Sequence, residues 1–164
     1  MPTTQADEPG CAVRLRTTVD KAAPRLLAMS LDDAVAHPAP GKWSPVEVIG
    51  HLVDSANNNH QRFVRAHAQD DLVFNGYDQD AWVSGQRYQK APWVELVHLW
   101  HLYNRHVARV MSATPREVRE RVHDRHNLHL LAFRKVPENQ STTLEYFMND
   151  YVDHLEHHLS QVFS

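Results

Sequence analysis

Three histidines near the end of the chain are the residues whose spacing most directly suggests chemistry. His154, His157 and His158 lie within the segment DYVDHLEHHLSQVF. On a helix that turns about 100° per residue, His154 and His158 share one face, whereas His157 points toward solvent. Two imidazoles one turn apart can bind a single ion. The alternative interpretation is a pair of buried histidines held only by packing and hydrogen bonds.

Four predicted helices would position these side chains. They cover about residues 13–29, 45–69, 92–112 and 141–163, with long connections between the second and third and between the third and fourth. The second helix has a strong start signal, because Ser44 is a typical N-cap, Pro45 suits the first helical position and Glu47 completes a capping box. The one candidate short strand ends at Phe133. This pattern predicts an all-α fold, a four-helix bundle with long connections, and such bundles build metal sites from facing helices.

A catalytic metal site needs about three protein ligands and an open position, so another helix must supply the third ligand. The third helix is a poor source, because its histidines lie off its apolar stripe and are expected in solvent: His98, His101 and His106. The second helix carries His51, His60 and His67. His51 falls outside the centre of the apolar stripe of that helix, so periodicity alone does not select it.

Length and composition limit the domain organisation, the partners and the location that can be expected. The chain has 164 residues and a formal net charge of −3. We expect a flexible tail over residues 1–12 and a single domain over 13–164. The charge gives no reason to expect nucleic acid or a membrane as a partner, and no apolar run reaches the roughly 18 residues of a membrane span. With Cys11 as the sole cysteine and no signal-peptide pattern, a cytoplasmic location is expected.

Three segments together resemble a known family. KWSPVEVIGHLVDSANNNHQRF, YDQDAW and the closing HLEHHLSQ are similar, in this order, to motifs of the DinB superfamily, and more narrowly to its DinB_2 and YfiT-like branch of metal-dependent enzymes. The resemblance covers about residues 13–163. It implies a four-helix bundle with a mononuclear site of three histidines, one on the second helix and two on the last.

Carried onto this sequence, the resemblance implies His51, His154 and His158 as ligands of one divalent ion, nickel, zinc or iron. His157 matches a position that is not counted as a ligand. Some relatives have paired histidines where this chain has Gly50 and His51. Relatives include thiol S-transferases that use low-molecular-weight thiols, and dimers are common among them.

The chemistry of such a site follows from its ligands. Three neutral imidazoles leave the ion its full charge and an open position, so it can lower the pKa of bound water to about 7 or bind a thiol as thiolate. Any nucleophilic sulfur is expected from a small thiol cosubstrate, since Cys11 lies near the end of the chain. Metal-bound imidazoles usually donate their other N–H to an acceptor, and Asp54 and Asp150 are candidates, or simply surface charges.

Two further residues are candidates for a substrate pocket. Arg62 either meets an anionic substrate or pairs with an acid. Trp82 either forms a wall of the pocket or anchors the core. Val46 and Val64 lie off the main apolar stripes. If the protein is a homodimer, these two residues would suit its interface.

Two functions remain open at this point. The first is a metal-dependent thiol S-transferase or hydrolase acting on a small molecule. The second is a non-catalytic bundle that binds a divalent metal in stress response or sequestration. A third possibility is that the histidines bind nothing in the cell and the fold is a scaffold. A fourth protein ligand that closes the coordination sphere would favour the second.

Overall fold

Four long helices form the body of the molecule. The structure is a computed structural model, and it describes residues 7–164. They are α1 (Gly10–Leu27), α3 (Pro45–Arg65), α5 (Trp93–Ala113) and α8 (Leu144–Val162). The predicted all-α four-helix bundle is confirmed. None of the helices in residues 7–164 combines the length and the apolar character needed to cross a membrane.

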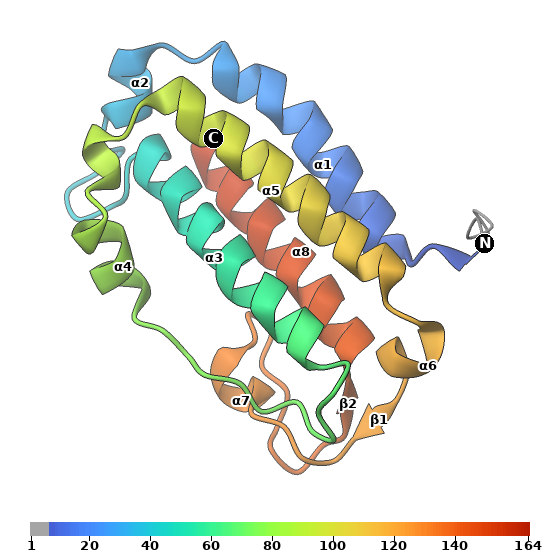
Figure 1. Cartoon of the computed structure of the whole chain (residues 1–164). Coiled ribbons are helices and arrows are strands. Elements are labelled where there is room, and N and C mark those ends of the chain that lie inside the picture. Colours follow the sequence, from blue (N-terminus) through green and yellow to red (C-terminus); the bar gives the residue numbers. More distant parts are fainter. Residues whose placement is uncertain (1–6) are drawn as a thin grey trace.

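The helices pack in an order that differs from their order in the chain (Figure 1). Helix α1 packs along α5 and α8, and α3 also packs along α5 and α8. The consecutive helices α1 and α3 therefore lie diagonally across the bundle, as do α5 and α8. Helix α8 runs antiparallel to α3, so its last turns lie beside the first turns of α3.

Local signals fix where the helices begin. The Glu47 carboxylate accepts from the backbone N–H of Ser44 at 3.2 Å and from its hydroxyl at 2.8 Å, so the predicted N-terminus of α3 is confirmed. At the start of α8, the Thr143 hydroxyl accepts from the backbone N–H of Tyr146 at 3.1 Å. This cap stabilises the helix that carries two of the candidate ligands.

The long connections contain short elements that the sequence does not reveal. They are α2 (Leu31–Val35), α4 (Gln79–Gly85), η2 (Tyr88–Lys90), α6 (Arg116–Arg119), β1 (Val122–His123), α7 (Leu128–Leu131) and β2 (Thr142–Thr143). Strands β1 and β2 pair antiparallel, with Val122 opposite Thr143. The segment that ends at Phe133 is therefore not a strand, since α7 occupies it.

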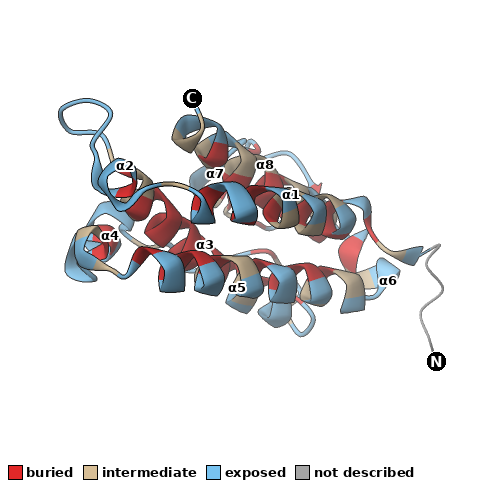
Figure 2. Ribbon diagram, turned by 90° about the horizontal axis from the view of Figure 1, so that it is seen from above, coloured by how far each residue is buried: buried red, intermediate tan, exposed pale blue. Residues whose placement is uncertain are grey.

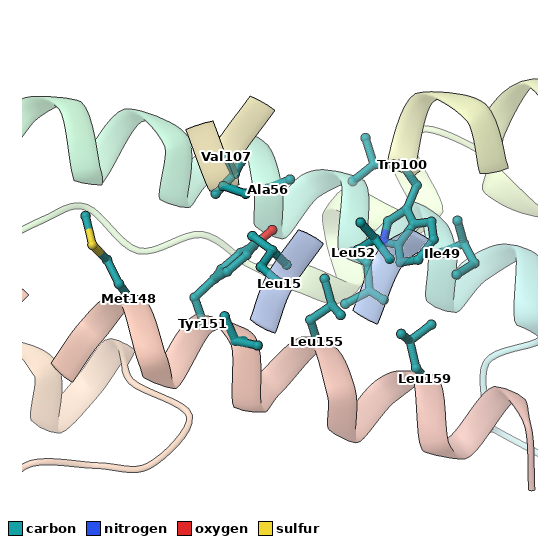
Figure 3. Close-up of a cluster of buried hydrophobic side chains, with 14 of the residues drawn as sticks. Leu15, Ile49, Leu52, Ala56, Trp100, Val107, Met148, Tyr151, Leu155 and Leu159 are labelled. Atoms are coloured by element: carbon teal, nitrogen blue, oxygen red, sulfur yellow. The ribbon is translucent and has the colours of Figure 1, made fainter. Parts of the chain in front are cut away.

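The core lies between the four helices and consists of aliphatic and aromatic side chains. Leu15, Leu52, Trp100 and Leu155 come from α1, α3, α5 and α8 and meet at the centre of the bundle (Figure 3). Buried residues line the inward faces of the helices, while the outward faces are exposed (Figure 2). Burial of these large apolar side chains stabilises the fold by roughly 1.5–3 kcal/mol each.

The N-terminal boundary differs from the predicted one. Helix α1 begins at Gly10, and Cys11 and Ala12 are buried in the core. The predicted tail of residues 1–12 is therefore too long, and its first part, residues 1–6, lies outside the described residues. The sequence pattern missed the first turn because it contains only small side chains.

The two valines proposed for a dimer interface have different surroundings. Val46 is fully buried within the chain, so its assignment to such an interface is wrong. Val64 is 49% exposed. A homodimer remains a prediction.

Candidate metal centre

His51, His154 and His158 meet where the first turns of α3 lie beside the last turns of α8. One ring nitrogen of each lies within 4.8 Å of those of the other two, an arrangement that could hold a metal ion. The Nε2 atoms of His51 and His154 are 3.3 Å apart. His51, which periodicity did not select, is only 1% exposed.

The distance between His51 and His154 suits a shared ion. Two nitrogens that each lie about 2.0–2.1 Å from a tetrahedral ion are about 3.3 Å apart. That separation is long for a hydrogen bond, since N–H donors usually approach acceptors to about 2.7–3.2 Å. The Nε2 atoms of His51 and His154 match the spacing of metal ligands.

The protonation state of the histidines also favours a cation. Burial, with a smaller contribution from neighbouring histidines, lowers the pKa of His51 to about 4 and that of His154 to about 3. Burial lowers the pKa of His158 as well. All three rings are therefore neutral near pH 7, which is the form that binds metals.

Aromatic rings that the sequence analysis did not select enclose the histidines. The Trp43 ring centroid lies 4.9 Å from that of His51 and 6.4 Å from that of His158. On the other side, the Phe133 ring lies 5.6 Å from His154. Trp43 directly precedes the N-cap of α3, so the helix-start motif was the available signal. These apolar walls lower the local dielectric constant around the three nitrogens.

Gln161 fixes the orientation of one candidate ligand. Its side-chain oxygen accepts from Nδ1 of His158 at 3.0 Å, which leaves Nε2 of that ring with a free lone pair. Its side-chain nitrogen donates to Nε2 of His157 at 3.2 Å. His157 is exposed, as predicted.

We expect Gln161→Leu to weaken zinc binding by about 10- to 100-fold, the usual cost of losing the outer partner of a ligating histidine. Isothermal titration of the metal-free protein with zinc measures this. Gln61→Leu is the matched control, since Gln61 lies exposed on α3 and bonds only to Asn57. Equal affinity in the Gln161 and Gln61 variants would rule out this role for Gln161.

The two candidate carboxylates bond elsewhere. Asp54 accepts from the Tyr88 hydroxyl at 2.6 Å and from the Gln86 amide at 2.8 Å. Asp150 accepts from the backbone N–H groups of Phe133 and Arg134 and thereby holds the loop after α7 against α8. Burial raises the pKa of both carboxyl groups. No hydrogen bond joins either carboxylate to a site histidine in the described structure, and Nδ1 of His51 is buried without a partner.

A pocket opens beside the three histidines. It has a volume of about 460 Å³ and lies between α3 and α8, with residues 76–79 and 130–135 completing its walls. Arg62 lines this pocket. Trp82 does not line it; it is 37% exposed and packs against the Tyr77 ring at 5.0 Å. Trp43, whose ring lies beside His51 and His158, lines a separate pocket.

The histidines of α5 lie away from this site. His98 and His106 are exposed, as predicted. His101 is not simply solvated, because its Nε2 lies 2.7 Å from the Asp20 carboxylate on α1. The large number of histidines in the chain is therefore explained only in part by the candidate metal centre.

Three inward histidines lie on two antiparallel helices of the bundle. The fold and the site together are those of a four-helix bundle protein with a candidate mononuclear metal centre. The chain belongs to the DinB superfamily, since the DinB_2 family model matches residues 14–162. Among solved structures, it is similar to YfiT from Bacillus subtilis, described as a probable metal-dependent hydrolase with an unusual four-helix bundle topology. That comparison has a TM-score of 0.77 and 18% identity, and it covers 98% of this chain and 86% of YfiT. No curated protein gives a significant match.

Proposed function

We propose that this protein is a metal-dependent enzyme that holds one divalent ion, nickel, zinc or iron, on His51, His154 and His158. In this proposal a nucleophile, either water or a small thiol, attacks an electrophilic small molecule in the adjacent pocket. The observation that carries the proposal is the convergence of three histidine nitrogens at the wall of a pocket of about 460 Å³.

The number of ligands favours an enzyme over a storage or sequestration bundle. Within residues 7–164, the cluster contains three potential ligands and no fourth carboxylate or thiol closes it. Catalytic zinc sites typically have three protein ligands and an open position, whereas structural sites have four. The description of YfiT as a probable metal-dependent hydrolase points in the same direction.

The chain's own residues would bind the ion and surround it. An ion in this site would provide a Lewis acid and lower the pKa of a water or thiol. The three imidazoles would hold it without neutralising its charge, and Gln161 keeps the His158 ring in the required tautomer. Trp43 and Phe133 pack against two sides of the cluster.

Cys11 is a poor nucleophile, so a thiol reaction requires an external thiol. It is buried in α1, and burial raises the pKa of its thiol to about 11. Only about 0.1% of such a thiol is ionised at pH 8. We expect the native protein to react very slowly with an aromatic disulfide reagent at pH 8, and the protein in denaturant to react at once. Equally fast labelling in both states would show that Cys11 is accessible.

The proposal is tested by elemental analysis of untagged protein, followed by activity screens. We expect about one divalent ion per chain, and turnover of either hydrolysable esters and amides or electrophiles mixed with small thiols. Chelation should abolish turnover, and adding the ion back should restore it.

Two results would overturn the proposal. One is the absence of bound metal after incubation with excess nickel, zinc and iron(II). The other is full metal loading without turnover in either screen, which would favour the non-catalytic metal-binding bundle.

A further inference from the structure

A buried arginine lies in the same pocket as the histidines. Arg62 is on α3 and is only 7% exposed. Its Nη1 donates to the Asn59 side-chain oxygen at 3.2 Å, and its Nη2 donates to the backbone oxygen of Asn75 at 2.7 Å. A guanidinium has five N–H donors, so these two bonds leave several of them free to bind a ligand.

The charge of Arg62 is not neutralised by the protein. Arg119 is the other buried arginine in residues 7–164, and its Nη1 lies 2.7 Å from the Glu145 carboxylate. No carboxylate of the described residues lies within 4.0 Å of the Arg62 guanidinium. The one acid that lines the pocket, Asp150, is occupied by two backbone N–H groups. Because an isolated buried charge is costly, this arrangement is typical of a site that binds an anion.

The position of Arg62 defines the length of the ligand. His51, Ser55, Asn59 and Arg62 line the pocket along one face of α3. The Arg62 side chain reaches back toward the helix N-terminus and contacts Asn59. At 1.5 Å per residue, the level of Asn59 is about 12 Å from that of His51. The ligand must therefore span roughly 10 Å between the histidine cluster and the guanidinium.

We propose that the substrate is an elongated small molecule with an anionic oxygen group, a carboxylate or a phosphate, that binds Arg62 while its reacting end lies at the three histidines. This inference rests on the proposed function, because it uses the histidine cluster as the place of reaction. Arg62 thus determines specificity. Polar Ser55 lines the pocket between the histidine cluster and the level of the guanidinium.

The test uses probes with a thiol at one end, which binds the metal, and a carboxylate at the other. Cobalt(II)-loaded protein is titrated with ω-mercaptocarboxylates of increasing chain length and with the corresponding amides, and the cobalt–thiolate absorption gives Kd. We expect the carboxylate to bind about 10- to 100-fold more tightly than its amide once the chain spans roughly 10 Å. Probes that are too long to chelate the ion through both ends but too short to reach Arg62 should show no such preference. Mercaptoalkyl phosphates of equal length distinguish the two kinds of anion.

Variants assign the preference to Arg62. Arg62→Met should make the carboxylate and amide probes bind equally, and Arg62→Lys should retain part of the difference. Lys135→Met is the matched control, because Lys135 also lines the pocket but is exposed and should contribute less than about 3-fold. Loss of the preference in Lys135→Met, with Arg62→Met unchanged, would overturn the assignment.

The outcomes separate the two proposals. If the protein binds no cobalt, the metal centre itself is wrong. If it binds cobalt and thiols but the wild type treats carboxylates, phosphates and amides alike at every chain length, only the Arg62 proposal is overturned. This comparison within the wild type holds even if Arg62→Met does not fold.

Discussion

Replacing His158 with alanine is expected to abolish stoichiometric metal binding. The two remaining imidazoles hold divalent ions far less tightly, and we expect the affinity to fall by more than about 100-fold, the upper end of the cost of losing only an outer partner. Elemental analysis after dialysis, with titration of the metal-free protein, measures this loss. The substitution should have little effect on folding, since His158 is only partly buried at the end of α8.

His157→Ala is the matched control for this experiment. It removes a histidine from the adjacent position of the same helix, but that side chain is exposed and outside the three-nitrogen cluster. Metal content should stay unchanged. A large loss in His157→Ala, or full occupancy in His158→Ala, would show that the last turns of α8 present different histidines to the ion.

Among substitutions that add only one methyl group, Gly50→Ala is expected to cause the largest loss of stability. A Cβ at position 50 would lie 2.3 Å from the Tyr88 ring, far inside contact distance. Tyr88 has little freedom to move, because it is buried and its hydroxyl donates to Asp54 at 2.6 Å. Overpacking of this kind costs about 1–3 kcal/mol, which lowers the melting temperature of a chain of this size by roughly 3–10 °C. Thermal unfolding followed by circular dichroism measures the shift.

Two controls isolate this contact. Gly10→Ala adds the same methyl group at the start of α1, where nothing lies within 4 Å, and should be neutral or slightly stabilising. In a Tyr88→Ala background, Gly50→Ala should lose most of its cost. An equal cost in both backgrounds would exclude Tyr88 as the cause.

The Tyr88 contact also limits what position 50 can hold. In this chain the Tyr88 ring occupies the space beside position 50, so no side chain fits there. The Tyr88 hydroxyl also donates to Asp54, the residue predicted as a partner of His51. Tyr88 lies in η2, within a connection that the sequence pattern treated as irregular.

Local features were readable from the sequence. The start of α3 followed from Ser44, Pro45 and Glu47, because capping depends on residues within one turn. The pairing of His154 with His158 followed from helical periodicity for the same reason. Four long amphipathic segments were also enough to predict the four-helix bundle, since each must bury its apolar face against the others.

Periodicity failed for His51 because α3 has more than one buried face. Every residue from 48 to 56 is buried, since α5, α8, α2, α4 and η2 all contact this helix. A single apolar stripe does not describe a helix surrounded by protein, and the family resemblance supplied the position instead. Trp43 was missed for a similar reason, because its contact with His51 depends on how the chain enters α3.

The sequence by itself determined the helices, their caps and the spacing of the histidines on α8, all of which are set by interactions over a few residues. The tertiary structure decided which histidine joins them, since His51 and His154 are 103 residues apart in the chain and meet only through antiparallel packing of α3 on α8. The tertiary structure also decided that Arg119 forms an ion pair with Glu145, whereas Arg62 has no carboxylate partner among the described residues. Such contacts depend on the packing of distant segments, which no local pattern encodes.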